Sequence, residues 1–177
     1  ATISTVTTAS FSKLTGSKKL TIDQTGDISL PLYVQATDAF SITGDELTTS
    51  VSLPKFNAAT TIAFAGISKA TSFSMPALAV HDGDISISIA NSGSVDLSAL
   101  TNSTTEAGAA DTTPDDLTVN AATLTAPLYD AGKITADRLT SVDLPKWKFD
   151  NDSSFDRALT VVLPSVDNAK AASYEID

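Results

Sequence analysis

The sequence lacks cysteine altogether, so the chain has no disulfide framework and no thiolate metal site. His81 is its only histidine, which leaves little for imidazole-based catalysis. No run of about 18 apolar residues is present, and a membrane-spanning helix is therefore not expected. Aromatic residues make up only 6% of the chain. This scarcity favours a fold of many thin layers over one with a single large aromatic core.

Positive charge is also scarce, with 11 basic residues against 21 acidic ones and a net charge of -10. Lys18 and Lys19 form the only adjacent basic pair. Because nucleic acids and anionic membranes are bound by clustered Lys and Arg, this balance argues against both as partners. The chain starts at Ala1 without a basic-then-apolar leader, as a processed exported protein would. We therefore expect an extracellular, cell-surface or virion location.

A six-residue phrase recurs along the chain in the order apolar, polar, apolar, Pro, any residue, apolar. Its copies span residues 28–33, 51–56, 73–78, 95–100, 124–129, 142–147 and 161–166; Ser98 replaces Pro in the fourth, and Val162 stands at the polar position of the seventh. Successive Pro positions, with Ser98 counted among them, lie 23, 22, 22, 29, 18 and 19 residues apart. A repeat of this length predicts stacked structural units.

Alternation with period two predicts a strand in each phrase, and Pro, which cannot donate to a strand ladder, belongs at the corner that ends it. A second alternating segment lies between successive phrases, for example Phe40-Ser41-Ile42-Thr43. The pattern predicts an all-β fold, a β-solenoid of about seven coils with a repeat of about 22 residues. The alternative is a β-sandwich, whose short alternating strands also recur.

One domain is expected over residues 1–177. Residues 1–19 are predicted as an N-terminal arm or cap, residues 20–166 as the coils and residues 167–177 as a C-terminal cap. Residues 101–116 lack an apolar period and account for the long interval of 29. They are predicted to leave the stack as a surface excursion.

Over residues 28–100 the repeat resembles the leucine-rich β-solenoid modules of bacterial surface proteins, the BspA-like group. In that group an aromatic residue precedes the Pro phrase by about a dozen positions. Phe64 stands 12 residues before Pro76, and Phe40 stands 14 before Pro54. The resemblance implies an exposed protein used for adhesion or assembly, with no catalytic residues to carry over.

Candidate sites for chemistry are few. Asp150, Asp152 and Asp156 offer oxygen ligands at spacings like those of a calcium loop, although its glycine and bidentate glutamate are missing; a solvated acidic loop is the alternative. His81 precedes Asp82-Gly83-Asp84, which is ordinary turn chemistry as well as a possible ligand set. No Gly-x-Ser-x-Gly elbow occurs, so we expect no enzyme activity and no cofactor other than a possible calcium ion.

Two surfaces carry the functional hypotheses. A strand-like segment at the N-terminus could add to the terminal coil of a neighbour, which predicts a self-assembling structural protein. This segment is Thr2, Ile3, Ser4, Thr5, Val6 and Thr7. The alternative is an adhesin, or an ice or glycan binder, acting through outward hydroxyls of the second strand column. These are Thr21, Ser41, Thr43, Ser86, Ser88, Thr118 and Thr135.

Overall fold

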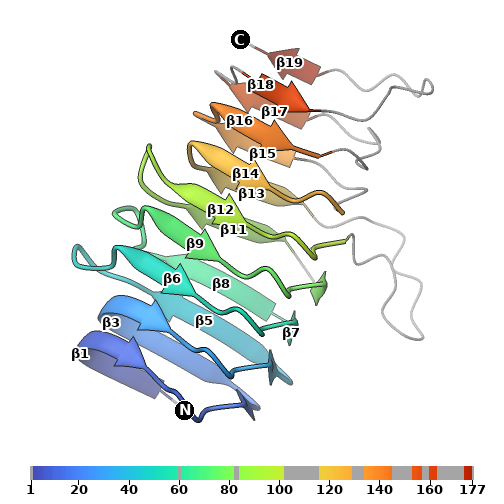
Figure 1. Cartoon of the computed structure of the whole chain (residues 1–177). Helices are drawn as coiled ribbons and strands as arrows, with labels where there is room; N and C mark the ends of the chain where they lie inside the picture. Colours follow the sequence, from blue (N-terminus) through green and yellow to red (C-terminus); the bar gives the residue numbers. More distant parts are fainter. Residues whose placement is uncertain are drawn as a thin grey trace.

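The computed structural model describes residues 2–59, 61–81, 84–101, 116–128, 134–144, 153–156, 160–162 and 174–176. Its regular elements are all β-strands, and no helix is present within these residues. The described part of the chain therefore holds no helix that could cross a membrane. The strands are stacked in layers, with the first and last described strands at opposite ends of the stack (Figure 1).

One face of the stack is built from the strands that carry the Pro phrase, and we call it the proline face. Its strands are β6 (Ser50–Ser52), β9 (Ser72–Ser74), β12 (Ser94–Asp96), β14 (Thr123–Thr125), β16 (Ser141–Asp143) and β18 (Thr160–Val162). They pair side by side in sequence order. Two longer strands, β1 (Thr2–Ser10) and β3 (Leu20–Ser29), begin on the other face and end on this one.

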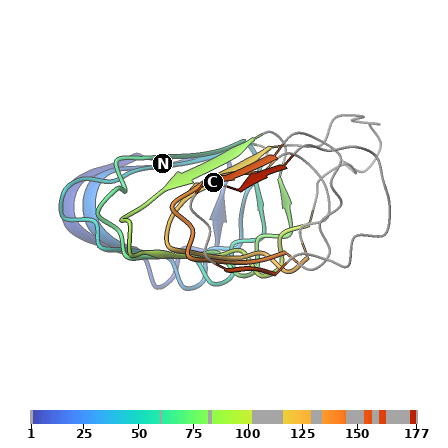
Figure 2. The same cartoon turned by 90° about the horizontal axis from the view of Figure 1, so that it is seen from above.

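The second face is formed by the strands between the phrases, and Figure 2 shows the two faces as two layers. Its strands are β5 (Ala39–Thr43), β8 (Thr61–Ala65), β11 (Ile85–Ser88), β13 (Leu117–Asn120), β15 (Ile134–Asp137), β17 (Ser153–Asp156) and β19 (Tyr174–Ile176). The first half of β3 pairs with β5, and β5 pairs with β8. β8 contacts β11 but is not in one hydrogen-bonded sheet with it, so this face is divided there.

A third, narrow sheet was not predicted. It consists of β2 (Gly16–Ser17), β4 (Gln35–Ala36), β7 (Ala58–Ala59) and β10 (Val80–His81), paired in the order β2-β4-β7-β10. Each strand follows a Pro corner or its equivalent. Two residues are too few for alternation to be visible in a sequence, which is why only the two longer strand columns were predicted.

Every pairing among the described strands is parallel. The alternative of a β-sandwich is therefore wrong, because such sandwiches are built from antiparallel sheets joined by hairpins and Greek-key connections. Equivalent positions of successive repeats face one another, as in Val51 opposite Phe73 and Phe73 opposite Val95. This register is compatible with the solenoid that the repeat predicted.

The phrase copies that the structure describes in full, at residues 28–33, 51–56, 73–78 and 95–100, form corners, as expected. The amide of Tyr33 donates to the carbonyl of Leu30 at 3.2 Å, and that of Phe56 donates to Leu53 at 3.2 Å. Pro31 and Pro54 stand second in these turns, the position that a fixed φ near -65° and a missing amide hydrogen suit best. The same turn bond closes the fourth copy, from Leu100 to Leu97 at 2.9 Å. The corner thus persists where Ser98 replaces Pro.

The core consists of inward rows that run along the stack. Ile28, Val51, Phe73 and Val95 are buried in one row of the proline face. Aromatic rings fill the space between the faces near the N-terminal half, where the ring centroids of Phe40 and Phe56 lie 4.5 Å apart. Such contacts add to the burial of apolar surface that drives folding.

Candidate assembly edges and hydroxylated face

The outermost strand at the N-terminal end is β1, which contains the predicted assembly segment Thr2 to Thr7. It pairs with β3 in parallel, with Thr2 opposite Thr21 and Ile3 opposite Ile22. Within the described residues no strand pairs with its other edge. An edge of this kind presents unpaired backbone donors and acceptors, which is the chemistry that strand addition requires.

The outermost strands at the other end are β18 on the proline face and β19 on the second face. β18 pairs only with β16 and β19 pairs only with β17 among the described strands. The two ends of the stack therefore both present a parallel strand edge. β18 lies within residues 20–166, which were predicted as coils. β19 lies within residues 167–177, which were predicted only as a C-terminal cap, because alternation over three residues carries little information.

The hydroxyl residues predicted as a binding face lie on the second face, in two separate groups. Thr21 and Ser41 stand in one row, which continues with Ala63. Ser86, Thr118 and Thr135 form a second row in the sheet that begins at β11. Thr43 lies beside the first group, opposite Ala65, and Ser88 lies beside the second. The alanines and the break between β8 and β11 interrupt the array.

A more regular hydroxyl array lies on the proline face, where it was not predicted. In each of five consecutive strands, β6, β9, β12, β14 and β16, a polar residue stands on either side of the buried central residue. These polar residues face their equivalents on the neighbouring strands, so they form two continuous rows. One row is Ser50, Ser72, Ser94, Thr123 and Ser141, and the other is Ser52, Ser74, Asp96, Thr125 and Asp143. The signal was present in the sequence, since the polar position of each phrase belongs to the second row.

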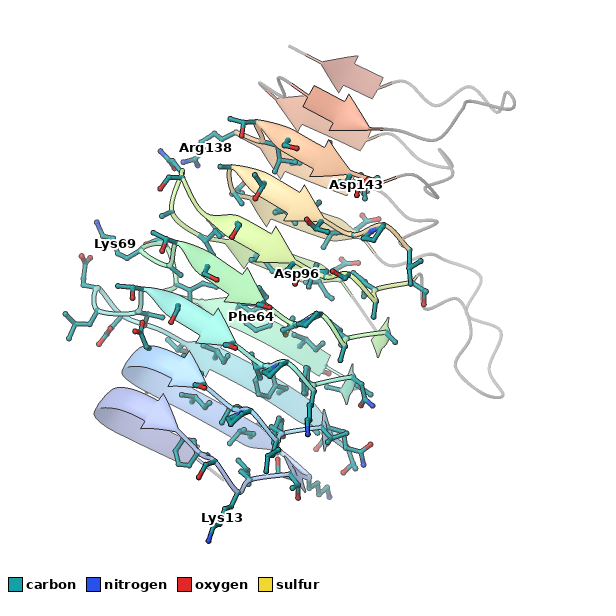
Figure 3. All side chains as sticks on the ribbon, viewed as in Figure 1. Lys13, Phe64, Lys69, Asp96, Arg138 and Asp143 are labelled. Carbon is teal, nitrogen blue, oxygen red and sulfur yellow. The ribbon has the colours of Figure 1, made fainter. Side chains whose placement is uncertain are left out.

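The proline-face rows form a grid of polar residues that are half-buried or exposed. Neighbouring strands lie about 4.8 Å apart and alternate residues of one strand about 6.6 Å apart. Such a grid can present many identical weak hydrogen-bonding groups at once, which suits a ligand that is itself periodic. Figure 3 shows Asp96 and Asp143 on this face, at the ends of their strands.

Asp27 links two repeats at the bend between the faces. Its Oδ1 accepts hydrogen bonds from the Thr49 amide at 3.0 Å, the Thr49 hydroxyl at 2.7 Å and the Ser50 amide at 2.9 Å. The pKa of Asp27 is held below its ordinary value of 3.8, and the hydrogen bond from the Thr49 hydroxyl is the largest cause. Burial, the next-largest effect, raises the pKa, and the hydrogen bonds from the amides of Thr49 and Ser50 lower it further. The carboxylate thereby ties β3 to the segment that enters β6.

The Tyr33 hydroxyl has a hydrogen-bond partner. The Tyr33 ring is buried in the core, and its hydroxyl lies 2.8 Å from Oγ of Ser17 in the narrow third sheet. Burial raises the pKa of the Tyr33 phenol above its ordinary value of 10.0, while the hydrogen bond with Ser17 acts in the opposite direction. The pair joins the third sheet to the aromatic cluster.

Of the predicted calcium ligands, Asp150 and Asp152 lie outside the described residues. Asp156 is in β17, opposite Asp137 of β15. His81 ends β10 opposite Ala59, and Asp82 and Gly83, which follow it in the sequence, lie outside the described residues. Within the described part of the chain no group of three acidic, histidine or cysteine side chains is placed to hold a metal ion.

No protein-family model, curated protein or solved structure matches this chain. The strand edges and the proline face are the features of the described residues that bear on function.

Proposed function

We propose that the chain is a β-solenoid of about seven coils that serves as a non-enzymatic structural protein and assembles through its edge strands. In this role the solenoid supplies a rigid shape on a cell surface, in an extracellular filament or in a virion. The observation that carries the proposal is the pair of outermost strands, β1 and β19, each with a partner on one side only among the described strands.

Assembly by strand addition follows from the chemistry of these edges. A parallel strand that has lost its neighbour leaves a row of amide and carbonyl groups for another chain to complete. The two ends of the stack are different surfaces, so the contact between copies is heterologous. Such a contact propagates as a filament unless it closes into a ring.

Deleting residues 1–10 tests the proposal. The shortened chain lacks β1, and the mean polymer length by electron microscopy and light scattering should fall severalfold. Ser72→Lys/Ser94→Lys is the matched control, because both residues are exposed on the proline face, away from either end. Unchanged polymers after the deletion, or equal loss in the control, would count against assembly through β1.

A second candidate function is binding of a periodic hydroxylated ligand, a glycan surface or ice, by the proline face. It is favoured by the two rows of hydroxyl and carboxylate groups that stay in register over five strands. If the chain has this function, Ser72→Lys/Ser94→Lys should abolish binding of the ligand while assembly persists. Ser86→Lys/Thr135→Lys, on the second face, is the control.

The two functions are separated by the same variants. Sedimentation with insoluble polysaccharide and measurement of thermal hysteresis report on the face, whereas light scattering reports on the edges. If Ser72→Lys/Ser94→Lys still binds the ligand but Ser86→Lys/Thr135→Lys does not, the ligand binds to the second face. If both double variants still bind the ligand, neither hydroxylated face is the binding site.

A further inference from the structure

The two terminal segments of the sequence carry opposite net charge. The first 22 residues contain Lys13, Lys18 and Lys19 and no acidic residue, a net charge of +3. Residues 150–177 contain six acidic residues against two basic ones, a net charge of -4. The three lysines are exposed, and Lys13 points away from the stack at the β1 end (Figure 3). The net charge of -10 is therefore unevenly distributed along the sequence, and its N-terminal segment is positive.

The register of the strands indicates how two ends would fit. Ile3 stands opposite Ile22, at one end of an inward row of the second face. At the other end of the stack Ile176 stands opposite Phe155, in the row that contains Val119 and Ala136. Ile22, Val119 and Ala136 are buried. Both terminal isoleucines are thus in register with rows of the second face that contain buried residues.

The neighbouring register positions are also equivalent. Thr2 stands opposite Thr21, and Glu175 stands opposite Ser154 in the row that begins at Ser86. Since all pairings within the chain are parallel, only a parallel joint continues the inward and outward rows from one copy into the next. A joint shifted by one residue would place inward positions opposite outward ones.

We propose that a second copy of this chain docks the free edge of its β1 on the free edge of β19, in parallel, with Ile3 opposite Ile176 and Thr2 opposite Glu175. This inference rests on the proposed assembly function and specifies its joint. Contacts between two β1 ends or two β19 ends bring like charges together and break the parallel rows. Opposite charges at unlike ends therefore select head-to-tail contacts.

Disulfide formation between introduced cysteines tests the register of β1 against β19 of a second copy. The chain has no cysteine, so Thr2→Cys/Glu175→Cys carries only two thiols. Facing positions on adjacent strands lie about 4.8 Å apart at Cα, within the range a disulfide spans. Oxidation should convert the double variant into a ladder of covalent multimers. Thr2→Cys/Ser154→Cys is the matched control, since Ser154 lies one strand farther from the end, about 9.6 Å from Thr2 across the joint.

The outcomes distinguish the joint from the assembly itself. A ladder from the first pair and none from the control supports the joint. Disulfide-linked dimers from Thr2→Cys alone, at a comparable yield, would show that two β1 ends meet and would overturn it. Polymers without any ladder overturn this joint and leave the proposed function standing. Absence of polymers of the unmodified chain overturns both.

Charge reversal tests the orientation separately. Lys13→Glu/Lys18→Glu should raise the critical concentration for assembly about tenfold at low salt, and the effect should shrink at 0.5 M salt because of screening. Adding Glu175→Lys should restore part of the loss. Lys55→Glu, exposed at a corner within the stack, is the control. An equal effect of the control, or no effect of the end variants, contradicts electrostatic selection of the joint.

Discussion

The amide of Ser98 donates a hydrogen bond to Oδ1 of Asp96 at 3.1 Å, and the Ser98 hydroxyl contacts the same oxygen. Ser98 occupies the corner position that Pro holds in the other copies of the phrase. A Pro there has no amide hydrogen to satisfy, whereas Ser brings one. Asp96 supplies the acceptor that this copy alone requires, so the substitution and its compensation are two residues apart.

This relationship predicts a coupled stability effect. Asp96→Ala should lower the free energy of unfolding by about 1–2 kcal/mol, because it removes the acceptor of a half-buried amide. In a Ser98→Pro background the same change should cost less than about 0.5 kcal/mol, since no amide remains. Ser98→Pro alone should raise stability by about 0.4–1 kcal/mol through the unfolded chain. Urea denaturation of the four proteins measures the coupling.

The control for this cycle is Asp143→Ala. Asp143 occupies the row of Asp96 on the proline face, but the residue two positions later is Pro145. Its loss should therefore cost less than about 0.5 kcal/mol. Equal costs at the two aspartates would mean that Asp96 acts through the surface row and not through Ser98.

Asp27 predicts an acid-sensitive link between repeats. Its pKa is lowered in the folded protein by the hydrogen bonds from Thr49 and Ser50. Its contribution to stability is thus fully present above the ordinary value of 3.8 and is lost as pH falls through the folded pKa. The stability advantage of the unmodified chain over Asp27→Asn, from urea curves between pH 7 and pH 2.5, should shrink only below about pH 3.8.

Thr49→Val provides the matched variant for this prediction, because the Thr49 hydroxyl is the largest cause of the lowered pKa. Without it, the pKa of Asp27 should move up toward 3.8, and the stabilising effect should be lost over a narrower and less acidic range. A loss that begins near pH 6 in either protein would assign the acid sensitivity to another group.

Tyr33 predicts a late phenol titration. Burial raises its pKa above 10.0, so the neutral phenol is favoured in the folded state and stability falls as pH rises past 10.0. The ultraviolet difference between the unmodified chain and Tyr33→Phe should therefore titrate above pH 10.0. Ser17→Ala should move that midpoint higher still, since it removes the hydrogen bond that lowers the pKa. A midpoint at or below 10.0 would contradict the burial of this side chain.

The sequence pattern predicted which side chains point into the core better than it predicted which strands pair with one another. Alternation places Val51 and Phe73 inside because the side-chain period of a strand is two, and the recurrence of Pro marks the corners. These features are local, so they can be read without knowing the partner strand. The parallel stacking followed from the repeat, which gives equivalent residues equivalent positions.

Features that depend on pairing across repeats were not predicted. The continuous path of β3 through both faces includes Gly26 and Asp27, a segment whose alternation is interrupted. The break beside β8 and the narrow third sheet likewise depend on how layers approach one another. The proline-face rows were missed because the phrase was interpreted from its apolar positions. Only the register shows that its polar positions line up.

A close approach between two glycines gives the last prediction. Gly66 has a φ of 65°, the left-handed region, and a methyl group there would collide with the carbonyl oxygen of Gly44. The Gly44 amide donates to the Ala65 carbonyl at 2.8 Å, which holds the two backbones together at the end of β8. Gly66→Ala should lower the free energy of unfolding by at least about 1–2 kcal/mol from the backbone conformation alone.

Gly16→Ala is the comparison, because a methyl group at Gly16 would lie 3.2 Å from the Gln35 carbonyl oxygen and the residue has no positive φ. Its cost in the same urea titration should be clearly smaller. Since β8 borders the break in the second face, Gly66→Ala should also speed amide hydrogen exchange in β8 more than in β14. Equal exchange in both strands would mean that the contact between Gly44 and Gly66 supports the whole stack and not the edge of β8.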